Sequence, residues 1–562
     1  MKGWQLALAV GAPVALGLAG LWYYKRLKAR ELGSSGKGSK TDKKAETSSE
    51  NTPSTPLELA QAAKNKGNKY FKAAQYDKAI ECYTQAIDLC PGNNPTDLST
   101  FHQNRAAAYE QLKNYPQVIE DCSKALCYNK KYVKALFRRA KASEHEGHLT
   151  MALNDVTAVC ILEGFQNQQS LYMADRVLKA LGKTKAKEKF KVREPTMPSP
   201  HFIRTFFSAF AHDPVMEKVA ECERQLKLND AEKHLNESPE KENQERNSSP
   251  FHKAIKAYVQ RDYSDIIHLC DEEINTNGAN VHEALLFKGT FHLLRGEGNL
   301  AMEAFDKIIS SDESSLEVKI NAYIKRGSLK MQNDLKDEAL ADFTEAVQVD
   351  SQNSDIYHHR GQLNLLLERV DEALRDFEKC VELNPGFAVA RVQKCYTEHR
   401  YAFMTKNPML FQTALKSFEE ALEEFRDCTE GYALYGQALC DQQMYELSEK
   451  NFQKAIELDP ENANIYVHRG LLQLQWKQDV DEAMKLLKKA IELDDLCELA
   501  YETLGTIEVQ RGCLDRAHEL FNKAINLAKT EQDMAHLYSL LAAAQAQSKA
   551  AHDLGLQMPG SM

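Results

Sequence analysis

The sequence contains no C-x-x-C pair, although it has 13 cysteines. Their number is odd and they are scattered from Cys82 to Cys513, so both a disulfide framework and a cysteine-rich zinc site are disfavoured. Unpaired cysteines are typical of a reducing compartment. Most of them lie on apolar stripes beside Leu and Ala, where we expect them to be small core residues.

An excess of positive charge is also missing. The chain has 81 acidic and 71 basic residues, and its formal net charge is -10. No global field would hold nucleic acid, so any anion-binding site must be local. The fragment "GSSGKGSK" at 33–40 lacks the spacing of a phosphate loop, and no strand precedes it.

Charge is absent from residues 3–24, a stretch long enough to span a bilayer as a helix. Four cations follow it at once: Lys25, Arg26, Lys28 and Arg30. A cleaved signal peptide is the alternative, but it would have a charged start and a shorter apolar core. We therefore expect a membrane anchor in residues 1–30, with the cationic flank and the rest of the chain in the cytosol.

Two segments are too polar to form a core. Residues 31–56 are rich in Ser, Lys, Thr and Gly, and we expect a flexible tether there. Residues 183–250 interrupt the pattern described next and end in a highly polar stretch, which predicts a linker whose second half is disordered.

A pattern with a period of about 34 residues fills the rest of the chain. The recurring residues are Gly or Ala at position 8 and Ala at position 20, where two helices would cross closely, an aromatic at position 24 to fill the gap to the next copy, and Pro at position 32 to end the second helix. The copies start at Ala60, Ser99 and Val133, then near Asn247, His282, Ile320, Ser354, Ala388, Thr429, Ala463 and Glu498.

This pattern resembles the tetratricopeptide family. The resemblance implies an all-α fold, a superhelix of about eleven helical hairpins whose first helices line a concave groove. Repeats 1–3 would form one module at 57–182, and repeats 4–11 a second at 251–562 with a capping helix at the C-terminus. Such arrays bind rather than catalyse, and no stretch remains for a catalytic domain, so we expect neither an enzyme nor a cofactor.

Five donors lie at positions 5 and 9 of repeat one, position 6 of repeat two, and positions 2 and 6 of repeat three. They are Lys64, Asn68, Asn104, Lys134 and Arg138, and all belong to first helices. Lys64 with Asn68, and Lys134 with Arg138, are spaced i, i+4, so each pair shares one helix face. Cations and amides converging on a groove suit carboxylates, whereas a merely solvated charged face is the alternative. The neighbouring Arg139 and Lys141 lie off that face.

The stretches "KNKGN", "QNRAAAY" and "KALFRRA" are similar to the dicarboxylate clamp of chaperone-docking tetratricopeptide domains. The resemblance implies that these five residues bind the C-terminal Glu-Glu-Val-Asp tail of cytosolic heat-shock chaperones. The tail carboxylate and the Asp side chain would be the two anions.

The corresponding positions of the later repeats lack a cation cluster, so their guest should be a hydrophobic or amphipathic segment. The candidate residues are Leu286, Phe287, His358, Val392, Tyr396, Val467 and Leu471. The adjacent His358 and His359 would point about 100° apart on a helix, which disfavours a shared metal ion, and we expect no metal site.

Stretches such as "AQAAKNKGNKYFKA" and "YVHRGLLQLQWKQD" resemble the tetratricopeptide receptor subunits of the mitochondrial outer-membrane protein translocase. The resemblance implies a single-pass receptor with its N-terminus in the intermembrane space and its repeats in the cytosol. Its partners would be chaperones, mitochondrial precursor proteins and other translocase subunits. The alternative is a membrane-anchored chaperone or signalling scaffold without a translocation role, and an endoplasmic-reticulum membrane is the rival location.

Overall fold

The computed structural model describes residues 55–233 and 249–556, which form 26 helices and no strand. The all-α expectation is confirmed. The expected anchor at 1–30 lies outside the described residues, as does nearly all of the tether at 31–56. No helix in the described part of the chain is long and apolar enough to cross a bilayer.

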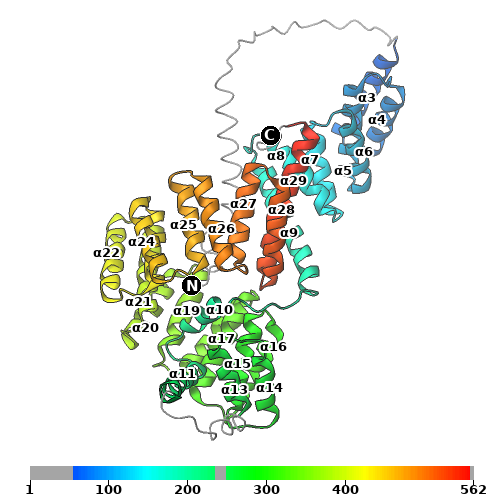
Figure 1. Cartoon of the computed structure of the whole chain (residues 1–562). Coiled ribbons are helices and arrows are strands. Elements are labelled where there is room, and N and C mark those ends of the chain that lie inside the picture. The colour runs from blue at the N-terminus through cyan, green and yellow to red at the C-terminus, as the bar shows by residue number, and fades with distance from the viewer. Residues whose placement is uncertain (1–54, 234–248, 557–562) are drawn as a thin grey trace. The chain divides into compact units, whose positions relative to one another are not determined.

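The repeats predicted from the sequence each form one hairpin of two packed helices (Figure 1). In the first three repeats these are α3 (Pro56–Lys72) and α4 (Tyr76–Leu89), α5 (Pro95–Gln111) and α6 (Tyr115–Tyr128), α7 (Val133–His145) and α8 (Leu149–Leu162). Repeats four to seven are α13 (Pro250–Val259) and α14 (Ile266–Asn275), α15 (Val281–Leu294) and α16 (Gly298–Ser310), α17 (Leu316–Gln332) and α18 (Lys336–Val349), α19 (Ser354–Leu366) and α20 (Val370–Leu383). Repeats eight to eleven are α21 (Ala388–Thr405) and α22 (Pro408–Glu424), α23 (Thr429–Asp441) and α24 (Tyr445–Leu458), α25 (Ala463–Trp476) and α26 (Val480–Leu493), α27 (Glu498–Arg511) and α28 (Leu514–Leu527).

Four helices lie outside the hairpins: α9 (Gln168–Phe190), α10 (Pro200–Ser208), α11 (Pro214–Lys233) and α29 (Glu531–Leu554). Three of them enter the segment 183–250, which the sequence predicted to be a linker. The structure differs from that prediction because α10 is amphipathic: Ile203, Phe206 and Phe207 are buried in a core shared with the later repeats. Residues 234–248 lie outside the described residues.

The chain divides into two compact units that are interleaved in sequence. Among the described residues, the first unit contains 55–191, 505–522 and 534–556, and the second contains 192–233, 249–504 and 523–533. The sequence predicted that everything after residue 250 forms one module. The structure instead assigns residues 505–522 and 534–556 to the unit that contains repeats 1–3. Most of α29 belongs there, where Ala542 and Ala546 pack with Leu178 of α9.

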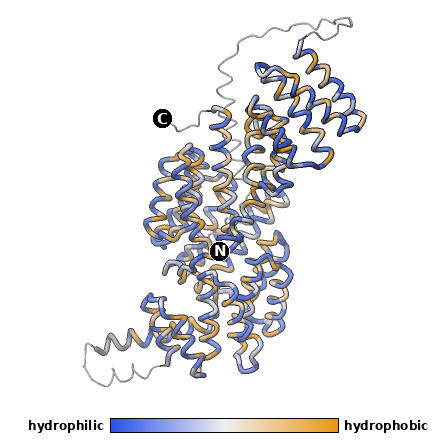
Figure 2. The backbone as a smooth tube through the Cα atoms, turned by 90° about the vertical axis from the view of Figure 1, so that its right-hand side faces the viewer, coloured by the Kyte–Doolittle hydropathy of each residue, from blue (hydrophilic) through white to orange (hydrophobic). Residues whose placement is uncertain are grey.

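Close packing within each hairpin explains the small and aromatic positions of the repeat. A Cβ atom added to Gly67 would come within 2.8 Å of the ring of Tyr83, and one added to Gly361 within 3.0 Å of Phe377. The aromatic at position 24 thus lies on position 8 of its own repeat, rather than filling only the gap to the next. Figure 2 shows hydrophobic and hydrophilic residues alternating along the helices, as this one-sided packing requires.

Ion pairs between positions 7 and 23 join the two helices of several hairpins. Arg139 illustrates them: its Nε and Nη2 atoms each donate to one oxygen of Asp155 over 2.7 Å. The same spacing links Arg105 to Asp121, Arg326 to Asp342 and Arg360 to Asp376. Arg139 therefore has a structural role, in agreement with its place off the predicted groove face.

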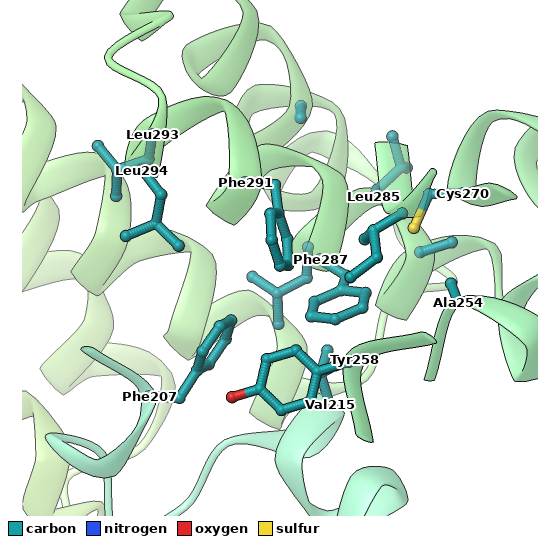
Figure 3. Close-up of a cluster of buried hydrophobic side chains, with 14 of the residues drawn as sticks. Phe207, Val215, Ala254, Tyr258, Cys270, Leu285, Phe287, Phe291, Leu293 and Leu294 are labelled. Carbon is teal, nitrogen blue, oxygen red and sulfur yellow. The ribbon is translucent and has the colours of Figure 1, made fainter. Parts of the chain in front are cut away.

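The core of the second unit is aromatic where α10 meets the repeats (Figure 3). The ring of Phe207 lies edge-on to Tyr258 of α13 with centroids 5.5 Å apart, and 6.0 Å from Phe287 of α15. Phe287 in turn is 5.0 Å from Phe291. Such pairs add to the hydrophobic free energy of burial, so α10 is an integral part of this core.

The cysteines are unpaired, and most are buried. Burial raises the pKa of the Cys122 and Cys380 thiols to about 12. These thiols stay protonated at neutral pH and pack as small apolar groups, as the sequence predicted.

Candidate functional site

The five predicted donors of the first unit all lie on first helices of the hairpins. Lys64 and Asn68 are on α3, Asn104 is on α5, and Lys134 and Arg138 are on α7. Helices α5 and α7 are in contact. The positions of the donors therefore match the register predicted from the repeat.

Side-chain bonds join these three helices into one wall. Gln61 of α3 donates to Asp97 of α5. The hydroxyl of Tyr132, directly before α7, donates to Gln103 of α5 over 3.0 Å. Because each bond connects first helices, the donor positions of successive repeats are held beside one another.

Most of the donors on this wall have no partner in the part of the chain that the structure describes. Lys64 and Asn104 are half-buried and Lys134 is exposed, and none of the three makes a hydrogen bond or ion pair within residues 55–233 and 249–556. Asn68 accepts a hydrogen bond of 2.8 Å from the hydroxyl of Tyr83 through Oδ1. That bond occupies only an acceptor of the amide, so both N–H groups of Asn68 remain available to a ligand.

The guanidinium of Arg138 has one nitrogen in an ion pair and another without a hydrogen-bond partner among the described residues. Its Nε donates to Oε2 of Glu110 over 2.7 Å. Its Nη1 is buried and has no hydrogen-bond partner among the described residues. By contrast, Arg139 next to it uses Nη1 as well, on the hydroxyl of Ser123 at 2.9 Å. A buried donor without a partner is costly, so an acceptor that reached Nη1 of Arg138 would relieve that cost.

The second unit contains a cavity of about 770 Å³. One wall is α10, and the others include first helices of repeats five to ten together with the turn after α22. The apolar and neutral part of the lining includes Phe202, Phe206, Phe210, Met331, Leu363, Leu366, Val389, Ala433, Leu434 and Ile465. A mostly apolar concave site of this size fits a side-chain cluster of a peptide.

None of the seven residues that the sequence suggested for precursor binding lines this cavity. Leu286, Phe287, His358, Val392, Tyr396 and Val467 are all buried at 3% exposure or less. Leu471 is 40% exposed but does not line the cavity. Choosing apolar residues at groove positions therefore selected mostly side chains that the core of the unit covers.

The groove register itself agrees with the cavity. Positions 6 and 9 of repeat seven, His359 and Gln362, line it, and so does position 6 of repeat ten, His468. Burial lowers the pKa of His468 to about 4, and burial also holds the pKa of His358 well below its usual range. Both imidazoles are neutral at physiological pH. No group of three potential metal ligands occurs in the described part of the chain.

A segment of the chain itself occupies part of the groove. The carboxylate of Asp355, at position 2 of repeat seven, accepts from the backbone N–H groups of Ala211 and His212, each at 2.8 Å. Asn321, at position 2 of repeat six, donates to the carbonyl of His212 over 3.0 Å. Position 2, which the sequence predicts to bind a ligand in repeat three, thus holds the connection between α10 and α11 in repeats six and seven.

A buried ion pair secures the same connection. Nζ of Lys325 donates to Oδ2 of Asp213 over 2.7 Å, and both side chains are 1% exposed. Oδ1 of Asp213 accepts from the N–H groups of Val215 and Met216 at the start of α11. The ammonium also lies 4.8 Å from the ring centre of Phe210. The pair therefore has the additional bonds that a buried charge requires.

Sequence reasoning missed α10 and its anchors. A signal was present, because "PSPHFIRTFFSAF" places Ser199 and Pro200 before a run of aromatic residues. The side chain of Ser199 accepts from the N–H of Phe202, which is an N-cap, and Pro200 is the first residue of the helix. The groove residues Asn321 and Lys325 occupy positions 2 and 6 of repeat six, the positions of Lys134 and Arg138 in repeat three.

Three family models match parts of the chain. The tetratricopeptide repeat matches at residues 60–93, and a second model of that name matches at 320–353 and 354–387. A further TPR repeat model matches at 436–475. The first three windows begin at Ala60, Ile320 and Ser354, which are repeat starts predicted from the sequence.

Curated relatives match over nearly the whole chain. The human protein named mitochondrial import receptor subunit TOM70 is 49% identical over 99% of this chain and 93% of its own length. The rat protein of the same name is 48% identical with the same coverage. Among solved structures, yeast Tom70 matches with a TM-score of 0.47 and 24% identity, covering 88% of this chain and 98% of that one. The chain belongs to the TOM70 family of mitochondrial import receptor subunits.

Proposed function

We propose that this chain is a single-pass receptor of the mitochondrial outer membrane that docks cytosolic heat-shock chaperones and receives hydrophobic precursor proteins from them. Residues 1–30 anchor it, with the N-terminus in the intermembrane space and the repeats in the cytosol. The precursors then pass to other subunits of the translocase. Family membership and the two sites described above support this proposal.

Chaperone docking is assigned to Lys64, Asn68, Asn104, Lys134 and Arg138. The observation that carries it is the contrast between Arg138 and its neighbour. Arg139 uses all three nitrogens of its guanidinium in hydrogen bonds, whereas Nη1 of Arg138 has no partner among the described residues. Together with the unpaired cations of Lys64 and Lys134, that edge forms a site for two carboxylates, as a Glu-Glu-Val-Asp tail presents.

A titration of the full chain in detergent micelles tests this assignment. Arg138→Ala should weaken binding of a Glu-Glu-Val-Asp peptide by roughly 2 kcal/mol, because a charge-assisted bond in a partly enclosed site is lost. Lys141→Ala is the matched control, since its ammonium lies 4.7 Å from the ring centre of Phe137 and off the wall. Equal effects of the two substitutions would show that the stretch is only a charged surface.

Precursor binding is assigned to the cavity of the second unit. Its mostly apolar lining, the neutral His468 and the carboxylates of Glu424, Asp427, Asp459 and Asp494 suit a hydrophobic or amphipathic segment rather than a carboxylate tail. The rival function, a membrane-anchored scaffold without translocation, needs no such cavity. Titrating a peptide from a hydrophobic precursor protein into the full chain separates the two functions. The scaffold function predicts no saturable binding of this peptide. The full chain is required, since a fragment starting at residue 251 would lose α10 from the cavity wall.

A further inference from the structure

The α21–α22 hairpin is longer than the hairpins beside it. Helix α21 has 18 residues, whereas α19 and α23 have 13 each. All three begin at the first position of their repeats, so the added residues lie at the end where α21 turns into α22. At about 1.5 Å per residue, this end extends roughly 7 Å further than in a neighbouring repeat.

The extended end is apolar and exposed. Phe403 is 60% exposed and Met404 is 57% exposed in the last turn of α21, and Met409 is 80% exposed in the first turn of α22. Single exposed apolar residues are ordinary on protein surfaces, but three large ones within seven residues are typical of an interaction surface. We call these three residues the hairpin tip.

The tip is a well-formed turn. Lys406 ends α21 in the left-handed conformation with φ of 51°, and the side chain of Asn407 accepts from the N–H of Met409 at 3.0 Å. Below it, the rings of His399 and Phe411 are 5.5 Å apart. The exposure of the apolar side chains is therefore fixed by the fold and is not the fraying of a helix end.

The charge of the tip itself is positive. Residues 403–409 contain Lys406 and no Asp or Glu, whereas Glu398, Glu419 and Glu420 lie further along the two helices, where Lys416 pairs with Glu420 at 3.3 Å. Lys406 is exposed and forms no ion pair with any other described residue. The adjacent α23–α24 turn is joined to α21 by a 3.3 Å contact between Gln442 and His399, and it exposes Met444 as well.

We propose that the hairpin tip docks on the surface of an anionic phospholipid bilayer. Phe403, Met404 and Met409 enter the boundary between headgroups and acyl chains, and Lys406 lies at the phosphate level. A projecting apolar tip with a cation and no carboxylate fits a planar anionic surface, whereas a partner helix would need a groove, and residues 399–418 do not line the cavity of this unit. Neither the clamp nor the precursor cavity is involved.

Photocrosslinking on the full chain tests the proposal. p-Benzoylphenylalanine replaces Met409, the protein is inserted into phosphatidylcholine vesicles with or without phosphatidylglycerol, and lipid adducts are quantified by mass spectrometry. Adducts are expected in the anionic vesicles, and Lys406→Gln should reduce their yield about fivefold, since one cation near an anionic surface has an effect of that size. Flotation of the vesicles shows separately whether the N-terminal anchor has inserted. A chain that does not float lacks a working anchor, whereas a chain that floats without lipid adducts at position 409 lacks tip docking.

The same probe at Leu316 is the matched control. Leu316 is 61% exposed but stands alone at the start of α17, at the opposite end of a hairpin. Equal lipid adducts at both positions would show random collision with the vesicle and overturn the proposal. An absence of adducts at position 409 would do the same. On isolated mitochondria, adducts of position 409 with a protein instead of lipid would assign the tip to a protein partner.

Discussion

Arg138 donates from Nε to Oε2 of Glu110 over 2.7 Å while its Nη1 stays buried without a partner among the described residues. The carboxylate fixes the plane of the guanidinium and leaves a second edge for a ligand. It also places a negative charge beside the cation that an anionic tail must approach. Glu110 therefore has two opposite influences on tail binding, orientation and repulsion, which two substitutions can separate.

Glu110→Gln keeps an acceptor for Nε but removes the charge. We expect a Glu-Glu-Val-Asp peptide to bind this variant about threefold more tightly. Two unit negative charges roughly 6 Å apart, one on Glu110 and one on the peptide, repel each other by about 0.7 kcal/mol in a water-like dielectric, and the variant removes this repulsion. Glu110→Ala removes both influences, so Arg138 loses its orientation and the gain should disappear. Fluorescence anisotropy of a labelled peptide measures both. Identical affinities of the two variants would refute an orienting role.

The cavity assignment predicts which apolar residue matters. Leu366 is half-buried in the cavity lining, and Leu366→Asp should weaken binding of a hydrophobic precursor peptide about tenfold or more, because a carboxylate would face the apolar guest. Leu471→Asp should leave binding unchanged, since Leu471 lies outside the lining. Circular dichroism must show that both variants are folded. The reverse order of effects would restore the residue set predicted from the sequence.

The buried pair of Lys325 and Asp213 should stabilise the second unit. Lys325→Met leaves the carboxylate buried without its cation, and we expect the free energy of unfolding to fall by about 3–5 kcal/mol. Asp213→Asn in the same chain should recover part of this loss, because the amide oxygen still accepts from the start of α11. Urea denaturation of the single and double variants measures the coupling. Additive losses would mean that the two side chains do not interact.

His399 should make stability depend on pH. Burial, with a contribution from Arg400, lowers the pKa of His399 to about 4, and the side chain is 1% exposed. As pH falls below about 6.5, the unfolded chain takes up a proton that the folded chain refuses. The free energy of unfolding should therefore decrease between about pH 6.5 and pH 4, by up to about 1.4 kcal/mol per pH unit.

Denaturation at pH 7 and pH 5.5 checks this effect in His399→Gln, which should lose less stability on acidification than the parent chain. His268→Gln is the control, because the His268 side chain is 73% exposed. A parent-like loss in His399→Gln would assign the acid sensitivity to other groups.

The repeat could be located from sequence because its signals lie within single hairpins. Gly361 and Phe377 mark positions 8 and 24 of one repeat, and they contact each other directly. The same register placed Arg138 on the groove wall and Arg139 off it. Spacing along one helix was sufficient for that distinction, since neighbouring residues point about 100° apart.

The precursor site could not be predicted in the same way. His358 and His359 are adjacent at groove positions, yet His358 is fully buried and only His359 lines the cavity. Apolar character identifies residues that avoid water but does not tell whether a core or a guest covers them. The role of α10 depends on contacts such as Asp355 with Ala211, which are 144 residues apart, and no local pattern reports these.

The C-terminal helix α29 has a consequence for biosynthesis. The hydroxyl of Ser539 bonds to the carbonyl of Leu178 across 361 residues of sequence, and Ala542 and Ala546 cover the apolar side of α9. At roughly 5–20 residues per second, a ribosome needs about 20–70 s to make the intervening chain. During that interval the nascent N-terminal repeats carry an uncovered apolar strip, so we expect their folding on the ribosome to depend on a shielding chaperone until the last helix emerges.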